Sequence, residues 1–403
     1  MSKTTIIFIA LIGGVAIGIF VGEGVISTSA DTIGALWLNA LRMTVIPLVV
    51  SLLITGISQT AAAARAGKLA TRAVITMMVI LWLSSTLAAV MIPILLSLFP
   101  MPAAAAEALR SALTAVAKPE AVPPLGDFLR AMIPTNPINA AASDAILPLI
   151  IFTTVFAFAI TRLPEDKRGH LTGFFDALAD AMVVIIGWVL ALAPIGVFAL
   201  SFVVGAKAGA AALGALAHYV IILSSLGVIV WIASFGVAGF GARKGLSEFF
   251  RAALPAQAVA ISTQSSIASL PAMLSGMKVL GVRESSSDVV LPLAVAIFRA
   301  TGPAMNFGVA LYIAYWFKIE LTPMVLAVGI AAGATTTLGA VSLPGTVSFV
   351  SSIAPICLAM GVPVEPLALL IAVETFPDIF RTLGNVTMDM AVTGTVARQH
   401  EQK

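Results

Sequence analysis

The sequence predicts an all-α polytopic membrane protein, and three observations support this fold class. Of the 403 residues, 60% are hydrophobic and only 10% are charged, whereas a soluble domain is expected to be about 25% charged. The mean hydropathy is +1.07. Apolar stretches recur from end to end, and many reach the roughly 18 residues that a helix needs to cross a hydrocarbon core of about 30 Å. The chain is therefore expected to cross a membrane many times.

Hydropathy predicts helices near residues 5–22, 34–59, 73–99, 144–161, 174–204 and 211–240. The first apolar run continues into further apolar spans, so it is expected to be a helix rather than a cleaved signal. Three basic loops punctuate these helices: Arg65/Lys68/Arg72, Arg162/Lys167/Arg168 and Arg243/Lys244/Arg251. If the N-terminus is cytoplasmic, all three fall on the cytoplasmic side, which predicts that both termini are cytoplasmic. The expected location of this multi-pass protein is the plasma membrane, of the bacterial inner-membrane type. The polar-leaning segment 101–128 is then an external loop.

Several classes of site and partner are excluded by composition. Cys357 is the only cysteine, which rules out an intramolecular disulfide and a cysteine-based metal cluster. The three histidines, His170, His218 and His400, are expected at loops or helix ends, and no Ser/His pair appears. The basic residues lie in short loops, so the net charge of +3 does not indicate nucleic acid. We therefore expect no enzyme activity, no cofactor and no nucleic-acid partner.

The last 150 or so residues contain two segments that favour re-entrant hairpins. The apolar stretch 249–277 is interrupted by Ser262–Ser266 and then by Leu270-Pro271, and the stretch 322–358 is interrupted by Thr335–Thr337 and then by Leu343-Pro344-Gly345. Irregular backbone at membrane depth must be buried in protein or face a wet cavity. One more apolar segment follows each stretch, 288–317 and 364–396, as in transporters with repeats around a midplane site. Ordinary helices kinked by proline are the alternative.

The final segment carries a stripe of polar residues in otherwise apolar sequence. At about 100° per residue they fall within an arc roughly 100° wide. Ionisable groups inside a bilayer are costly and usually mark a pathway. Two interpretations compete: Asp378 and Arg381 neutralise each other structurally, or Asp378 binds an ammonium and Arg381 a carboxylate by bidentate hydrogen bonds. The stripe consists of Glu374, Asp378, Arg381, Thr382, Asn385 and Asp389.

A second buried cation, Arg299, precedes Gly302, Pro303 and Gly308. These residues predict a helix break, which frees backbone carbonyls to coordinate a cation. The same residues are also compatible with a simple kink.

The chain resembles the dicarboxylate/amino acid:cation symporter family, which includes the glutamate and aspartate transporters. The resemblance covers almost the whole length and rests on six motifs that occur in the family's order. They are Leu41–Leu48, Pro134–Pro137, Ala193–Ala199, Ser265–Pro271, Leu343–Gly345, and Asp378–Asn385 followed by Asp389.

This resemblance implies an elevator-type fold of eight transmembrane helices plus two re-entrant hairpins, in a homotrimer embedded in membrane lipid. Residues 1–248 would be mainly scaffold, with helices 3 and 6 joining the transport unit. Residues 249–403 would be the transport core of hairpin 1, broken helix 7, hairpin 2 and helix 8. The implied substrate-binding residues are Asp378, Arg381, Thr382, Asn385, Ser265, Ser266, Leu343 and Gly345. The implied cation-binding residues are Asp389, Asn385, Thr301, Met305 and Asn306, with Na⁺ at Asp389.

The sequence departs from the family pattern at its cation sites. Aligned through Ala310–Tyr312, the family's Asn-Met-Asp-Gly-Thr becomes Met305–Val309. Phe307 thus replaces a sodium-ligating aspartate, Leu81 replaces a helper tyrosine, and Ile313 replaces a coupling glutamate of animal members. Gln264 stands where some prokaryotic members have arginine. At least one sodium site is expected to be absent, which leaves Na⁺ or H⁺ as the coupling ion.

The predicted function is cation-coupled uptake of an acidic amino acid, L-aspartate or L-glutamate. Glu374 is the first candidate proton carrier. Arg299 is expected either to supply a fixed charge where the missing cation would sit, or to pair with Glu374. The alternatives are a proton-coupled or C4-dicarboxylate symporter, an anion channel, and a transport-dead sensor. A channel needs a continuous polar lining, and a sensor usually carries a signalling domain.

Overall fold

The computed structural model describes residues 3–101, 130, 132–143, 145–338 and 345–401, and every regular element in these ranges is a helix. This confirms the all-α class. Five described segments are long and apolar enough to cross a membrane: Val25–Arg65, Lys68–Leu98, Glu165–Ala191, Leu213–Ala242 and Glu284–Trp316. Shorter apolar helices accompany them, so the chain is a multi-pass membrane protein. The predicted loop 101–128 lies outside the described residues apart from Met101.

The first half of the chain contains ten described helical elements, which are, in order, α1 (Lys3–Val21), α2 (Val25–Arg42), α3 (Val45–Arg65), α4 (Lys68–Leu98), α7 (Pro137–Ala142), α8 (Ile146–Ile160), α9 (Glu165–Ala191), α10 (Ala193–Ala208), α11 (Ala211–Gly236) and the π-helix η1 (Val237–Ala242).

Two predicted helices are in fact pairs of helices. The predicted span 34–59 is divided between α2 and α3 at Met43 and Thr44, where the Thr44 hydroxyl donates to the Leu41 carbonyl at 2.7 Å. The predicted span 174–204 is divided between α9 and α10 at Leu192. Pro194 is in the first turn of α10, where its missing N–H costs nothing, but its ring prevents α9 from continuing. Continuous hydropathy concealed both breaks.

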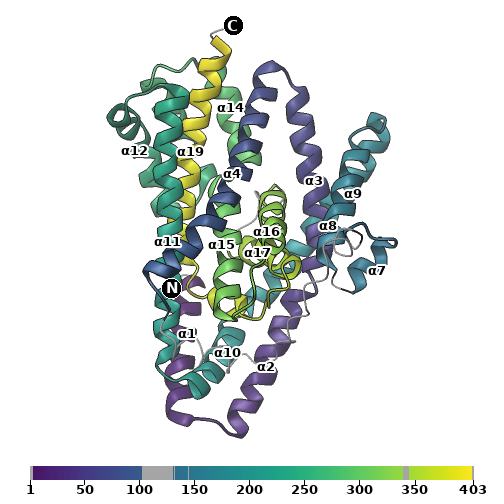
Figure 1. The fold of residues 1–403 in the computed structure, drawn as a ribbon, viewed down its shortest axis with the longest axis vertical. Coiled ribbons are helices and arrows are strands. Elements are labelled where there is room, and N and C mark those ends of the chain that lie inside the picture. Colours follow the sequence, from purple (N-terminus) through teal and green to yellow (C-terminus); the bar gives the residue numbers. More distant parts are fainter. Residues whose placement is uncertain (1–2, 102–129, 131, 144, 339–344, 402–403) are drawn as a thin grey trace.

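The N-terminal helix α1 packs against α10, which also packs against α2 (Figure 1). Glycines permit this close approach, because a side chain at Gly18 would overlap the backbone of Phe202 and one at Gly205 would overlap that of Val15. Small residues of this kind are typical of helix interfaces in membranes. The indole N–H of Trp37 donates to the Val189 carbonyl at 2.9 Å and ties α2 to the end of α9.

The C-terminal half contains α12 (Leu246–Thr263), α13 (Ser266–Val279), α14 (Glu284–Ile297), α15 (Thr301–Trp316), α16 (Pro323–Thr336), α17 (Gly345–Ala359), α18 (Leu367–Leu370) and α19 (Thr375–Glu401). Helices α12 and α13 pack together as a pair, as do α16 and α17. Leu343 lies outside the described residues, whereas Gly345 begins α17.

The predicted break in segment 288–317 is present, but it lies at residues 298–300, just before Gly302 and Pro303. A proline is tolerated in the first turn of a helix, so Pro303 begins α15 rather than interrupting it. Gly308 lies within α15, facing Leu226 of α11. Arg299 therefore occupies the break itself.

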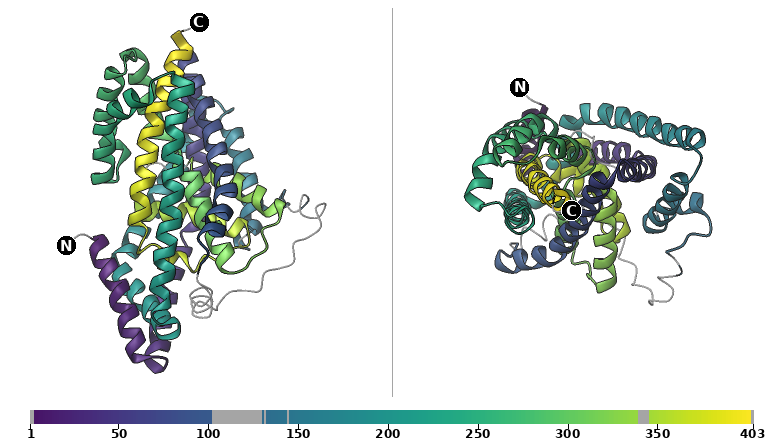
Figure 2. Two further views of the ribbon diagram at one scale, coloured as in Figure 1. Left: turned by 60° about the vertical axis from the view of Figure 1, so that its left-hand side comes forward. Right: turned by 90° about the horizontal axis from the view of Figure 1, so that it is seen from above.

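Helix α19 is enclosed by other helices and runs alongside α11 (Figure 2). It packs against α4, α11, α12, α13, α14, α15 and η1. Its C-terminal end is tied down because Arg398 donates to the Gly241 carbonyl at 2.6 Å and Arg72 donates to the Gln399 carbonyl at 2.9 Å. The polar stripe on α19 must therefore face the interior of the protein.

Candidate functional site

The centre of the candidate site is a buried ion cluster at the start of α19. The Arg381 guanidinium lies 2.6 Å from Glu374 Oε1 and 2.9 Å from Asp378 Oδ1. Glu374 lies in the turn before α19, and its Oε2 accepts a 2.7 Å hydrogen bond from the Tyr219 hydroxyl on α11. Glu374 is 4% exposed and Arg381 is 7% exposed, so bulk water does little to screen them. The cluster thus holds a buried guanidinium, a group suited to binding carboxylates, between two carboxylates of the protein.

The structure bears on the structural interpretation of the Asp378–Arg381 spacing. The two side chains form the predicted i, i+3 ion pair. The guanidinium also engages Glu374, which the simple pair does not account for. Two carboxylates on one guanidinium leave a net negative charge.

The helix break at 298–300 is bonded directly to the stripe. The Thr301 N–H donates to Asn385 Oδ1 at 2.9 Å, and the Thr301 hydroxyl lies 2.7 Å from that oxygen and 2.8 Å from the Arg381 carbonyl. The Ser84 hydroxyl of α4 donates to the carbonyl of Ala300. The break, α4 and α19 thus meet at one place, where carbonyl and amide oxygens of the kind that coordinate cations at broken membrane helices accept hydrogen bonds.

Asp389 is the most isolated charged group of the stripe. It is fully buried, and neither carboxylate oxygen has a hydrogen-bond partner among the described residues. A buried carboxylate without partners is costly unless a cation or a proton joins it. Arg299 interacts electrostatically with Asp389, and also with Asp378 and Arg381. The surroundings of Asp389 therefore suit a bound cation.

The other predicted residues surround this centre. Thr382 is buried on α19, and Met305 and Asn306 are buried on α15. Ser265 caps α13 by accepting from the Ala268 N–H at 3.2 Å, and Ser266 begins that helix.

Gln264 brings the turn between α12 and α13 to the site. Its side-chain amide donates to the Thr375 carbonyl at the start of α19, at 3.0 Å. The structure thus brings the serine-rich turn next to the cluster.

The described residues contain no group of three or more His, Cys, Asp or Glu arranged to hold a metal ion.

Phe307 lies where the resemblance implies a lost sodium ligand, and the space around it is apolar. A side chain at Gly329 on α16 would overlap the Phe307 ring and crowd the Met360 sulfur. Phe307 and Ile313 are fully buried, and Leu81 is 1% exposed. A closely packed aromatic ring therefore occupies this position.

Two neighbouring residues of the site were missed or misplaced from the sequence. Tyr219, which holds Glu374, gave no signal beyond being a single polar-tipped residue in an apolar run. The prediction that His218 lies at a loop or helix end is wrong, because it lies within α11 with both ring nitrogens bonded. The sequence signal available was that His218 lies more than one turn inside the apolar stretch predicted as a helix, which indicates a position within the helix.

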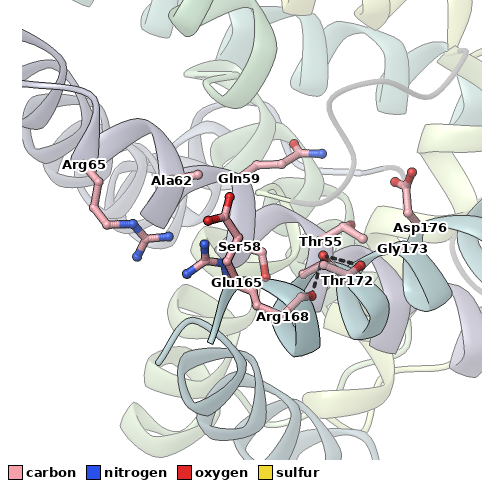
Figure 3. Close-up of a pocket in the computed structure, with 11 residues that line it drawn as sticks. Thr55, Ser58, Gln59, Ala62, Arg65, Glu165, Arg168, Thr172, Gly173 and Asp176 are labelled. Carbon is pink, nitrogen blue, oxygen red and sulfur yellow. Dashed lines mark hydrogen bonds between the residues drawn. The ribbon is translucent and has the colours of Figure 1, made fainter. Parts of the chain in front are cut away.

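A separate polar cavity of about 470 Å³ lies between α3 and α9 (Figure 3). Arg65 and Arg168 line it together with the buried Thr55 and the acidic Glu165 and Asp176. None of the stripe residues line this cavity. We place the functional site at the ion cluster instead, because its buried charged groups can bind a charged ligand.

Comparisons with known proteins indicate the family to which the chain is similar. A sequence model of the Sodium:dicarboxylate symporter family matches residues 4–399. The chain is similar to the "Proton/sodium-glutamate symport protein" of Bacillus subtilis (strain 168), with 29% identity over 95% of this chain and 89% of that protein. It is 28% identical to the "Proton/glutamate-aspartate symporter" of Escherichia coli (strain K12), over 91% of this chain and 84% of that protein. A "C4-dicarboxylate transport protein" of Laribacter hongkongensis (strain HLHK9) is 25% identical over 97% of this chain and 88% of its own length.

Proposed function

Because the chain belongs to the sodium:dicarboxylate symporter family, we propose that it is a secondary transporter that imports an acidic amino acid, L-aspartate or L-glutamate, together with cations. The observation that carries this proposal is Arg381 held between Glu374 and Asp378. A guanidinium is suited to the side-chain carboxylate of the substrate. The Asp378 carboxylate is suited to the ammonium group of the substrate. An amino acid with two carboxylates and one ammonium matches both signs of charge.

The roles of individual residues follow from the same chemistry. Asp378 would bind the substrate ammonium, and Arg381 would exchange Glu374 for the substrate carboxylate. Thr382 and Asn385 would contact the remaining polar groups of the substrate, while Ser265 and Ser266 would close over it. Leu343 and Gly345 would close from the α16–α17 side.

Charge balance supports coupling to cations. The two arginines and three carboxylates, Arg299, Arg381, Glu374, Asp378 and Asp389, leave one net negative charge when all are ionised. An acidic amino acid adds another, and burying net charge in a membrane is costly. Na⁺ at Asp389, with oxygens from Thr301, Asn385 and the neighbouring turn at Met305 and Asn306, would offset it. A proton on Glu374 is the second route, and the apolar packing at Phe307 favours proton over multiple sodium coupling.

We also propose the family's architecture for this chain. It comprises eight transmembrane helices plus two re-entrant hairpins, α12–α13 and α16–α17, in an elevator mechanism with residues 249–403 as the core of the moving unit. A bacterial inner-membrane location with cytoplasmic termini follows from the basic loops. Phe174 and Trp188 on α9 are 61% and 69% exposed, which supports contact of this helix with lipid or with a second subunit of a homotrimer.

A C4-dicarboxylate is the second candidate substrate. Its supporting observation is that Asp378 already has a cationic partner in Arg381, so the site need not provide an ammonium ligand. The similar dicarboxylate transporters point the same way. The dianion would meet a cluster that is already negative, which favours the amino acid.

Counterflow in liposomes distinguishes the two candidates. Liposomes preloaded with unlabelled L-aspartate should accumulate labelled L-aspartate, and Asp378→Asn should abolish this exchange. Succinate exchange that survives Asp378→Asn, with no exchange of L-aspartate in the parent protein, would replace the first candidate with the second. Absence of both exchanges would contradict transport of acidic substrates.

A further inference from the structure

His218 lies where α4 ends against α11, and both of its ring nitrogens have partners. Nε2 is 2.7 Å from the carbonyl oxygen of Phe99, and Nδ1 is 2.9 Å from the hydroxyl of Tyr312 on α15. The Tyr312 hydroxyl is in turn 3.3 Å from the carbonyl oxygen of Ala215. Tyr312 is 1% exposed, whereas His218 is partly exposed and can exchange protons with water.

The Phe99 carbonyl fixes the tautomer of the neutral ring. A carbonyl oxygen can only accept, so Nε2 must carry a hydrogen. Nδ1 of the neutral ring then accepts from the Tyr312 hydroxyl. Neutral His218 is therefore fully bonded.

The protonated ring is equally well accommodated. When Nδ1 takes up a proton from water, it donates to the Tyr312 oxygen, because a hydroxyl both donates and accepts. The Tyr312 hydrogen then turns to the Ala215 carbonyl, which lies within reach. Both charge states therefore find partners without movement of the backbone.

We propose that His218, Tyr312 and the carbonyls of Phe99 and Ala215 form a proton-binding site. Nδ1 takes one proton from a hydronium ion: the N–H bond forms as the O–H bond of the hydronium ion breaks, which leaves water. The reverse step returns the proton. Histidine is the side chain whose charge changes between about pH 5 and 8. Among the described residues, the titratable group that contacts its ring is Tyr312.

Packing links this site to the ion cluster. The rings of Tyr312 and Tyr219 meet edge to face with centroids 5.3 Å apart, and the Tyr219 hydroxyl donates to Glu374. The charged groups beyond Tyr219 are Glu374, Arg381 and Asp378. His218 is thus a positioning residue: its charge state changes the hydrogen bond of Tyr312, whose ring packs against Tyr219. Tyr219 in turn holds Glu374. Only this effect on transport rests on the proposed function; the proton site itself does not.

Nitrogen NMR of the full-length protein in lipid nanodiscs tests the proton site directly. The chain has three histidines, so ¹⁵N-histidine labelling gives few signals, and His218→Gln identifies the one from residue 218. We expect an Nε2–H tautomer at high pH, with Nδ1 accepting, and an imidazolium with both ring nitrogens donating at low pH. An Nδ1–H tautomer, or a ring that never becomes imidazolium, would overturn the proposal.

Tyr312→Phe probes the partner. The hydroxyl serves both states, but a buried imidazolium without an acceptor loses more than a neutral ring does. The midpoint at which NMR detects the imidazolium should therefore differ between Tyr312→Phe and the parent protein. Tyr315→Phe, on the same helix but 46% exposed, is the matched control and should leave the midpoint in place. An equal shift in both variants, or none in Tyr312→Phe, would contradict the assignment.

Counterflow of labelled L-aspartate across a pH series supplies the transport readout. The parent protein should show an inflection at the NMR midpoint, which Tyr312→Phe should move by the same amount and His218→Gln should remove. An inflection that stays in His218→Gln would mean that His218 only caps α4. Absence of counterflow in the parent protein at any pH would count against the proposed function, while the NMR titration would still decide the proton site.

Discussion

Arg381 Nη2 lies 2.6 Å from Glu374 Oε1, so the guanidinium proposed to bind the substrate is already held by a carboxylate of the protein. Glu374 and an incoming carboxylate compete for the same donor. A proton on Glu374 weakens its hold on Arg381 and favours the substrate. Competition at one guanidinium thus provides a physical link between proton binding and substrate binding.

Glu374→Gln should separate these two events. Glutamine can still accept from Tyr219 but carries no charge to release. We expect L-aspartate affinity to lose the part of its pH dependence that persists in His218→Gln, and proton-driven uptake to fall at least about tenfold, since a charged hydrogen bond is worth roughly 1.5–3 kcal/mol. Binding measured by isothermal calorimetry at several pH values, beside uptake, checks this. Unchanged pH dependence in the variant would exclude Glu374 as the proton carrier.

Arg381→Ala should be severely destabilising, whereas Arg381→Lys should mainly affect binding. Alanine leaves Glu374 and Asp378 buried without a cation, at a cost of about 3–5 kcal/mol. Lysine keeps the charge but loses the planar bidentate geometry. Thermal unfolding in detergent, with L-aspartate binding on the folded lysine variant, separates the effects. An alanine variant as stable as the parent would show that the cluster is not as dry as its burial indicates.

Asp389→Asn should remove the stabilisation of the protein by its coupling cation. The neutral side chain also relieves a buried charge, so we expect the variant to be more stable than the parent without cation and insensitive to added Na⁺ or acid. Thr393→Val is a matched control, because Thr393 donates to the Asp389 backbone carbonyl and not to its carboxylate. Cation-dependent melting temperatures decide this, and retained cation dependence in Asp389→Asn would place the site elsewhere.

Gly329→Ala should disturb the packing of α16 against the Phe307 ring. The added methyl group would meet the Phe307 ring, which is fully buried, and overpacking of this kind costs about 1–3 kcal/mol. Phe307→Leu in the same chain should recover part of that loss. A double-mutant cycle of thermal stability measures the coupling between the two sites. Purely additive effects would mean that the ring moves away at little cost.

The functional stripe was predictable because ionisable residues stand out in an apolar helix. Asp378 through Asp389 share one face of α19 by helical geometry alone, and the enclosure of α19 follows from the cost of these groups in lipid. The pairing of Arg381 with Glu374 was not predictable, because it depends on how the turn before α19 folds back. Tyr219 was invisible for a similar reason, since its role arises only when α11 packs against that turn.

The helix breaks show the limits of hydropathy. Segment 174–204 is continuous in hydropathy, yet α9 ends at Ala191 because Pro194 begins a new helix. The break beside Arg299 was predicted from Gly302 and Pro303, but proline is tolerated in a first turn and so displaced it towards the N-terminus. The positions of proline therefore set these helix boundaries, and hydropathy did not reveal them.

Uptake of labelled L-aspartate into liposomes, under an inward proton gradient without sodium and then under an inward sodium gradient, tests cation-coupled symport most directly. The geometry at Glu374 and Phe307 predicts concentrative uptake driven by the proton gradient, and any addition by sodium should disappear in Asp389→Asn. Uptake that never exceeds the external concentration under either gradient would contradict the proposed symport.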